Sequence, residues 1–539
     1  MMMGDCRMIN YWKHAFFLLV SLSLLSAAGC SGDLPAAPQP KAPETAQDNA
    51  LNQGFPIVNQ QVRIRMFGRR DQSQIPWNRM VVFKEYERKS NVKVVFEDVP
   101  MPGFTERKNL LFASGELPDA FFKANLTTTE IMRYGMSEKL LVPLDSLIRD
   151  HAPHVNALFD KYPEVRKSMT ASDGHIYTLP LLTTADAYRT YLKPWVNKKW
   201  LQKARLRPPA TIDELIAMYR VFRDSDMNGN GIADEIPLSA ESITNLILAM
   251  GGSWGLENQF KYYFNIEDGH VRLWLTDPRF KEMIMFFNRL YEEKLLDQEI
   301  FTQDGATYFA KMNQGIIGNF YLGSTDRFKD VEADYMGIAP YQGPEGQQKV
   351  SAFNPIVVDP GGFAITKANG HPEVTMRWID YFYSEEGAEF YRFGIKGDTY
   401  KLNASGKPEF TDKILKDPRG PTAALGEINN MTGGGSPHWI SESNDSFIDP
   451  PSVIEAHAAL IPYLPKAVYS SPIFDKATFE RISPIKSDVD KFVAEAIPPF
   501  VTGELSFNKW DEFRATLRKI GVEELEKAYQ SAYDAMNRQ

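Results

Sequence analysis

A run of acidic and amide residues between positions 224 and 235 could bind a metal ion. It reads Asp224-Ser-Asp226-Met-Asn228-Gly-Asn230-Gly-Ile232-Ala-Asp234-Glu235. Calcium takes about six to eight oxygen ligands, which calcium loops supply from alternate positions around a glycine at the sixth. Registers starting at Asp224 and at Asp226 both fit, and we prefer the second because Asp234 and Glu235 can then both turn back onto the ion. The ligands predicted for Ca²⁺ are Asp226, Asn228, Asn230, the Ile232 carbonyl, Asp234 and Glu235; the alternative is a polar turn without metal.

The predicted calcium site has a structural role rather than a catalytic one. No histidine lies nearby and the oxygen ligands leave no obvious open position. The loop follows a helix that begins with the capping sequence Thr211-Ile-Asp-Glu214. The chain has only two cysteines, Cys6 and Cys30, which excludes thiol catalysis, zinc–thiolate sites and a disulfide framework in its body. Calcium would therefore hold this loop where a disulfide is not available.

The N-terminal thirty residues have the pattern of a secretory signal. Arg7 and Lys13 precede an apolar run over 15–25, and small residues lead to Cys30. Ala-Ala-Gly before the cysteine resembles a bacterial lipobox, which predicts lipid attachment at Cys30; an ordinary signal peptide is the alternative. Residues 31–55 are rich in Pro, Ala and Gln and predict a flexible tether. We therefore expect a signal peptide over 1–29 and an anchored tether over 30–55.

The body of the chain alternates strand and helix patterns. Strand signals near 62–66, 92–96 and 120–122 are separated by helical stretches, which predicts right-handed crossovers and a mostly parallel sheet. Helices dominate after 180, strand signals return at 352–366, and the last fifty residues are mostly amphipathic helix. The fold class expected is α/β with two lobes that the chain crosses between more than once.

Composition excludes several classes of protein. The 539 residues are 43% apolar and 24% charged, enough for two or three domains and unlike a disordered chain. The net charge of −9 argues against a nucleic-acid-binding surface. Beyond the N-terminal segment no apolar run is long enough to span a membrane.

Several segments, in order along the chain, resemble the extracellular solute-binding proteins of ABC importers. The similarity is greatest to large Gram-positive lipoproteins and to the calcium-containing alginate-oligosaccharide-binding proteins. The segments that carry it are Asn91-VKVVFEDVP, Leu110-LFASGELPDAFF, Leu140-LVPLDSLI, Asp173-GHIYTLP, Asn197-KKWLQKARLRPPATIDEL, Leu290-YEEKLLDQEIFT, the block from Gly361 to Tyr400 and Trp510-DEFRATLRKIGVEELEKAYQSAYDAM. Departures are Ala204-Arg205, where the family often has Leu-Gly, and Lys396, where it often has glutamate.

The resemblance implies a type II periplasmic-binding-protein-like fold with two lobes, several hinge crossings and a helical C-terminus. We expect residues 56–178 and 350–395 to form an α/β first lobe. Residues 179–349 and 396–539 would form a mixed, helix-rich second lobe that carries the calcium loop.

The resemblance also implies that the lobes close on a carbohydrate, with aromatic faces covering sugar rings. Aromatic residues in turn-like or glycine-flanked contexts are the best candidates for contact, whereas Trp200, Trp378 and Trp510 are assigned to packing. The residues predicted to contact ligand are Trp77, Trp254, Tyr321, Phe353, Trp439, Asp119, Asn319 and Glu442.

The function expected is the substrate-binding subunit of an ABC importer, held outside the cytoplasm by a lipid anchor and working as a monomer with membrane permease subunits. It would not be an enzyme. One alternative is a secreted calcium-dependent polysaccharide-active enzyme, which would need two carboxylates flanking a sugar bond. Another is a sensory surface lipoprotein with the same fold.

Overall fold

The computed structural model describes residues 54–259, 263–325, 331–444 and 451–538. The predicted signal peptide, Cys30 and most of the predicted tether lie outside these residues. Within the described ranges no helix is both long and apolar enough to cross a membrane.

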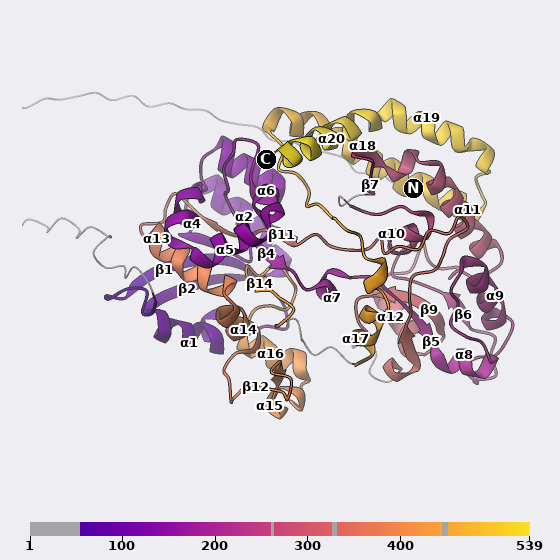
Figure 1. The fold of residues 1–539 in the computed structure, drawn as a ribbon, viewed down its shortest axis with the longest axis horizontal. Coiled ribbons are helices and arrows are strands. Elements are labelled where there is room, and N and C mark those ends of the chain that lie inside the picture. The colour runs from indigo at the N-terminus through magenta and orange to yellow at the C-terminus, as the bar shows by residue number, and fades with distance from the viewer. Residues whose placement is uncertain (1–53, 260–262, 326–330, 445–450, 539) are drawn as a thin grey trace, which may run out of the picture. The chain divides into compact units, whose positions relative to one another are not determined.

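The first lobe is built around a six-stranded sheet (Figure 1). β1 is parallel to β2 and β3, β11 is antiparallel to β3 and β4, and β14 is parallel to β4. The carboxyl ends of β1, β2, β3, β4 and β14 therefore lie at the same edge as the start of β11. In sheet order the strands are β14 (Trp439–Ile440), β4 (Leu179–Thr183), β11 (Val357–Ile365), β3 (Ala120–Phe122), β1 (Val62–Arg70) and β2 (Val92–Pro100).

Helices cover both faces of this sheet, and β1 shows why. Ile64 and Met66 point into one apolar cluster and Phe67 into another, as the period of two in a strand requires. Gly68 lets the Trp77 indole pack under the strand, because a Cβ there would come within 2.5 Å of the ring. The longer helices are α1 (Val81–Ser90), α2 (Met101–Ser114), α4 (Asp145–His151), α5 (Pro153–Lys161), α6 (Pro163–Met169), α13 (Pro372–Asp380), α14 (Glu385–Phe393) and α16 (Pro421–Ile428).

The second lobe contains a four-stranded sheet in the order β10 (Tyr335–Gly337), β5 (Lys193–Asn197), β9 (Ile317–Leu322) and β6 (Ile236–Leu238). β6 is parallel to β9, and β5 is antiparallel to β9 and β10. The ends of β6, β9 and β10 thus share an edge with the start of β5. Its longer helices are α8 (Lys198–Ala204), α9 (Ile212–Arg223), α10 (Ile243–Met250), α11 (Pro278–Glu292), α12 (Gly305–Asn313) and α17 (Pro451–Ala458).

The C-terminal helices α18 (Lys476–Thr502), α19 (Trp510–Ile520) and α20 (Val522–Arg538) complete the second lobe. Glu526 and Gln530 of α20 accept the Leu273 and Val271 amides of β8 (His270–Leu273), which pairs with β7 (Phe264–Glu267). These contacts cover one edge of the hairpin. The helical C-terminus expected from the sequence is confirmed.

Among the described residues, three segments run between the lobes, at 184–192, 338–356 and 459–475. The first two run antiparallel: Asn354 donates its amide to the Arg189 carbonyl at 2.8 Å, and the Arg189 Nε donates to the Asn354 carbonyl at 2.9 Å. The third joins them through the Val350 amide and the Tyr463 carbonyl, 2.9 Å apart. The predicted fold with several hinge crossings is confirmed.

The expected lobe boundaries need correction at two places. β4 lies inside the first sheet, between β11 and β14, although residues from 179 onward were expected in the second lobe. Residues 396–440 also belong to the first lobe, where Tyr400, Phe410 and Leu425 join its apolar core. Their strands are too short to give a clear sequence signal: β12 (Tyr400–Leu402) and β13 (Pro408–Phe410) have three residues each, and β14 has two.

Candidate ligand-binding site

The edge where the strands of the first sheet end is covered by the segment Met431–Ser436, which we call the glycine loop. Lys123 directly follows β3, and its Nζ donates to the carbonyl oxygens of Asn430 and Thr432, both at 2.5 Å. Arg69, near the end of β1, donates from Nη2 to the Gly433 carbonyl at 2.8 Å. In open α/β sheets ligands bind at the carboxyl ends of the strands. This loop therefore forms part of a candidate wall.

The conformation of the glycine loop requires glycine. Gly433, Gly434 and Gly435 all have positive φ, between 68° and 82°. A Cβ on Gly435 would lie 2.3 Å from the Asn125 Oδ1 and 2.9 Å from the Asp359 Oδ2. The loop can lie this close to the end of β3 and the start of β11 only because it carries no side chains there.

The first connecting segment brings three of the predicted ligand-binding residues together. The Trp439 indole donates to the Thr184 hydroxyl at 3.1 Å. The Asp186 amide donates to the Glu442 carboxylate at 3.1 Å, and the Arg189 guanidinium lies 4.2 Å from the centre of the Phe353 ring. Trp439, Glu442 and Phe353 thus all contact residues 184–189, but Trp439 and Phe353 are buried, at 7% and 4% exposed, and of the three only Glu442 is exposed.

Tyr188 is a candidate that the sequence reasoning missed. It lies on α7 (Asp186–Arg189), and 41% of its surface is exposed, unusually much for a large ring. The guanidinium of Arg392, a fully buried residue, lies 6.0 Å from the ring centre. Tyr188 has no glycine or proline neighbour, so its context did not stand out. Its position on the segment between β4 of the first lobe and β5 of the second lobe was the signal available.

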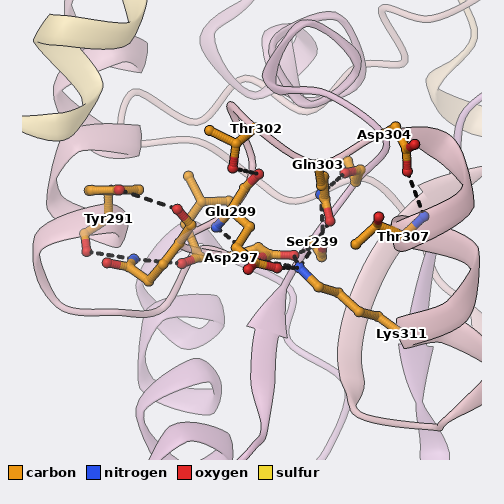
Figure 2. A network of polar contacts seen from close by, with 12 residues as sticks. Ser239, Tyr291, Asp297, Glu299, Thr302, Gln303, Asp304, Thr307 and Lys311 are labelled. Carbon is orange, nitrogen blue, oxygen red and sulfur yellow. Dashed lines mark hydrogen bonds and ion pairs between the residues drawn. The ribbon is translucent and has the colours of Figure 1, made fainter.

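A polar network holds the corresponding edge of the second sheet (Figure 2). Ser239 follows β6 and donates its hydroxyl to Asp297 at 2.7 Å; Asp297 also binds the Lys311 ammonium at 2.8 Å. Lys311 contacts Glu299 at 2.8 Å, and the Gln303 amide donates to the Ala240 carbonyl at 2.8 Å. The network fixes the turn between β6 and α10, so both edges have rigidly placed backbone.

Two predicted tryptophans belong to the lobe cores. Trp77 is fully buried and donates to the Gln74 side chain at 3.0 Å. Trp254 is buried against Phe286. Its glycine-rich turn is itself buried: a Cβ on Gly252 would lie 1.9 Å from the Lys349 carbonyl oxygen. The expectation of ligand contact is corrected for both residues, because glycine here permits close packing rather than exposure.

Three further predicted residues have structural partners. Asn319 is fully buried, accepts the hydroxyls of Tyr219 and Tyr341, and donates to the Trp195 carbonyl at 2.6 Å. Tyr321 is buried beside it. Asp119 precedes β3, at the opposite edge of the sheet, and accepts the Arg65 amide at 2.7 Å. These positions correct the expectation that Asn319, Tyr321 and Asp119 contact ligand.

Burial controls the charge of two groups beside the glycine loop. Burial, together with the nearby positive charge of Arg69 and opposed by Asp71, lowers the pKa of Lys123 to about 7. Burial also lowers the pKa of His438 to about 3, assisted by the positive charge of Arg392. The His438 Nδ1 lies 2.8 Å from the Ser436 carbonyl, and its Nε2 is buried without a hydrogen-bond partner. Burial therefore weakens the positive charge of Lys123 and His438 beside the loop.

The predicted calcium loop folds around its own acidic groups. Asp226 accepts the Gly229 and Gly231 amides at 2.6 and 3.1 Å, and Asp234 accepts the side-chain amides of Asn228 and Asn230 at 2.8 and 2.9 Å. Asp224 instead pairs with Arg223 outside the loop.

Glu235 completes this set of oxygen atoms. Its Oε1 accepts the Met227 amide at 2.6 Å, and its Oε2 is buried without a hydrogen-bond partner. An all-oxygen set with an unpaired buried carboxylate oxygen fits a hard cation such as calcium. Across the described residues, no three His, Cys, Asp or Glu side chains form a metal-binding cluster by themselves. Any ion here would need the amide and carbonyl oxygens too.

Cavities also occur away from the two edges. One of about 720 Å³ lies between residues 167–174 and α20, and one of about 570 Å³ lies between α10 and α18. The second is lined mainly by aliphatic and aromatic side chains. Neither contains the strand ends or the connecting segment 184–190, where polar and aromatic groups meet. We therefore place the candidate site at the strand ends.

Comparison with known proteins agrees with this fold. Residues 77–389 match the model of the bacterial extracellular solute-binding protein family. The chain is 25% identical over 539 residues to the fructooligosaccharide ABC transporter substrate-binding protein FusA of Streptococcus pneumoniae, covering 97% of this chain and 98% of FusA. It is 21% identical to the polygalacturonan/rhamnogalacturonan-binding protein YtcQ of Bacillus subtilis, covering 97% and 99%.

Solved structures share the architecture. FusA from S. pneumoniae in complex with kestose has a TM-score of 0.73 at 23% identity, over 88% of this chain and 99% of FusA. A FusA EF-hand mutant has the same score. The alginate-binding protein AlgQ2, in a structure without calcium ion, has a TM-score of 0.71 at 24% identity, over 89% and 100%. With more than half of its length matched by the family model, this chain belongs to the bacterial extracellular solute-binding protein family.

Proposed function

We propose that this chain is the substrate-binding subunit of an ABC importer and that it captures an oligosaccharide between its two lobes. The observation that carries the proposal is the exposed Tyr188 ring together with the exposed Glu442 carboxylate, on or against a segment that connects the lobes. Ligand contact there would bear directly on lobe closure. FusA and YtcQ, related along nearly the whole chain, are named for carbohydrate binding, which supports this ligand class.

Capture in this way needs no catalytic group. An aromatic face covers the apolar side of a sugar ring, and carboxylate and amide groups bind its hydroxyls. Tyr188 supplies an exposed ring, and Glu442 supplies a carboxylate. The chain would bind and release the sugar unchanged and deliver it, as a monomer, to permease subunits in the membrane.

Titration calorimetry with a panel of oligosaccharides tests the proposal. We would use kestose, alginate oligosaccharides and oligogalacturonides, followed by chromatography of the recovered sugar. Binding with intact sugar recovered is the expected result. Shortened products formed at a catalytic rate would favour the alternative, a polysaccharide-active enzyme, and no heat with any sugar would overturn the ligand class.

We also propose that Asp226, Asn228, Asn230, the Ile232 carbonyl, Asp234 and Glu235 bind a structural calcium ion. The unpaired Glu235 Oε2 and the all-oxygen set support this. When bound, the ion would hold the loop between α9 and β6 by coordination. The names of the AlgQ2 structure and the FusA EF-hand mutant are consistent with calcium in related proteins.

A lipid anchor at Cys30 would keep the protein at the outer face of the membrane. The sequence around Cys30 supports this, and a relative from B. subtilis, 19% identical over 85% of this chain, is named lipoprotein LipO. Labelling cells with a radioactive fatty acid should mark the wild type and leave Cys30→Ala unlabelled. Equal labelling of both would exclude this attachment point.

A further inference from the structure

We propose that Lys123 is a positioning residue that clamps the glycine loop and thereby sets the shape of one wall of the ligand site. The inference rests on the proposed function in one respect, since the loop is a wall of the site only if ligand binds at the strand ends. The clamp itself is a property of the fold and can be tested without ligand.

The hydrogen bonds of the Lys123 ammonium are both made with backbone carbonyls at the start of the glycine loop. Only 1% of its surface is exposed, and its Nζ bonds two carbonyls that are two residues apart, those of Asn430 and Thr432. The backbone amide of Lys123 donates to the Gly362 carbonyl at 2.7 Å, which fixes the base of the side chain to β11. One side chain thus ties the loop to two strands of the sheet.

Neighbouring bonds converge on the same two carbonyls. The Gln74 side-chain amide donates to the Thr432 carbonyl at 2.9 Å, and the Ser436 hydroxyl donates to the Asn430 carbonyl at 3.1 Å. Each of these two carbonyl oxygens would lose one of its two donors if Lys123 were replaced, and losing a hydrogen bond at a buried group is unfavourable. The remaining donors, Gln74 and Ser436, each reach only one of the two carbonyls, whereas Lys123 joins both.

The glycine loop needs an external clamp because it has few anchors of its own. Three consecutive glycines carry no side chain and gain more backbone freedom on release than other residues. Inside the loop, the Gly434 amide bonds the Met431 carbonyl at 3.1 Å. Outside it, Arg69 holds the Gly433 carbonyl. The Lys123 clamp is the most deeply buried of these anchors.

The clamp does not depend on the charge of the amine. The charged and titratable groups that act on Lys123 are Arg69 and Asp71, and His438 lies close enough to feel its charge. A neutral amine keeps two N–H donors, one for each carbonyl. The loop should therefore remain held on both sides of neutral pH.

Hydrogen–deuterium exchange of Lys123→Met tests the clamp, with Lys108→Met as the matched control. Lys108 is also buried in the first lobe, at 4% exposed, but it pairs with Glu130 far from the loop. We expect exchange of amides 431–436 to rise about tenfold in Lys123→Met, as the loss of hydrogen bonds to two buried carbonyls predicts. Lys108→Met should lower the melting temperature and leave this exchange unchanged. Exchange unchanged in Lys123→Met would overturn the proposal.

Binding of kestose, or of another oligosaccharide that the wild type binds, tests the consequence. Affinity should fall about tenfold in Lys123→Met and stay at the wild-type value in Lys108→Met, a split that a general loss of stability would not produce. A looser loop with wild-type affinity would overturn the role in binding. If the wild type bound no sugar, the proposed function would fail, while the exchange result alone would still decide the clamp. Should Lys123→Met not fold, Lys123→Leu, which also lacks a donor, replaces it with the same expectations.

Discussion

The two lobes hold their strand ends with lysines, one buried and one partly buried, whose partners differ in charge. At the first edge Lys123 is bonded to two backbone carbonyls. At the second edge Lys311 is bonded to the carboxylates of Asp297 and Glu299 (Figure 2). Both lysines fix a turn that follows a strand. The first arrangement is neutral apart from the lysine, whereas the second is a network of ion pairs.

Lys123 and Lys311 occupy similar places beside the strand ends of their sheets, but burial affects their charges differently. Without a bonded counterion, burial lowers the pKa of Lys123 to about 7. A carboxylate partner compensates the charge of Lys311 but makes each partner costly to remove. The second edge should therefore be sensitive to the loss of a single charge, whereas the pH response of the first lobe should come from the buried His438.

Removing the Asp297 carboxylate should have the largest effect on stability. Asp297→Ala leaves the Lys311 ammonium without its buried partner and should lower the free energy of unfolding by about 3–5 kcal/mol. Urea denaturation measures this. Glu299→Gln, at an exposed partner of the same lysine, should cost less than about 1 kcal/mol. Equal costs for the two variants would contradict the view that the buried pair dominates the second edge.

Acid should destabilise the first lobe through His438. Its folded-state pKa of about 3 lies below the unfolded value, so the unfolded chain binds a proton first and stability falls as pH drops from about 6.5 towards 3. The loss is at most about 1.4 kcal/mol per pH unit. Urea unfolding at pH 7 and 4.5 should show a smaller difference for His438→Phe than for wild type, with exposed His175→Gln as control. The same pH response in wild type and His438→Phe would contradict the assignment.

Chelation should affect the second lobe, which contains the predicted calcium loop. Removing calcium should lower stability by about 2 kcal/mol if the ion is present well above its Kd. Thermal unfolding with and without chelator measures this, and Asp226→Ala should abolish the sensitivity. Asp224→Ala, whose carboxylate pairs with Arg223 outside the loop, should retain it. A wild-type melt unaffected by strong chelation would end the calcium proposal.

Tyr188 gives the smallest predicted effect, and it concerns affinity. Tyr188→Ala should weaken oligosaccharide binding about tenfold through the loss of one exposed ring, with little change in stability. Tyr188→Phe keeps the ring and should bind within about threefold of wild type, since each lost exposed hydrogen bond is worth little. Calorimetry measures both. Wild-type affinity in Tyr188→Ala would place the ligand elsewhere on the edges.

The sequence predicted the order of elements well where patterns were long. The strands and helices from Val62 to Phe122 appear as expected, because alternation and helical periodicity there extend over whole elements. The packing roles of Trp200, Trp378 and Trp510 are likewise confirmed, each being buried on a helix. Local pattern was sufficient for these features.

The candidate site was predicted less well because it depends on contacts between distant segments. Trp254 lies in a glycine-rich turn, but the turn packs inside the second lobe, and local sequence cannot show what covers a turn. β14 has two residues and is placed in the first sheet by its pairing with β4. Trp439, on that strand, reaches Thr184 across 255 residues of sequence. Tyr188 was missed because it is a candidate through its place on the segment that connects the lobes, which the residues next to it in sequence do not reveal.

Hydrogen–deuterium exchange with a bound oligosaccharide directly tests whether the sugar is captured between the two lobes. With kestose or the tightest-binding sugar of the panel at saturation, amide exchange should slow in residues 184–190 and 431–442 of the first edge and in 239–242 and 322–325 of the second. Protection at both edges would agree with capture between the lobes. Protection confined to the cavity between α10 and α18, or none at any saturating sugar concentration, would contradict it.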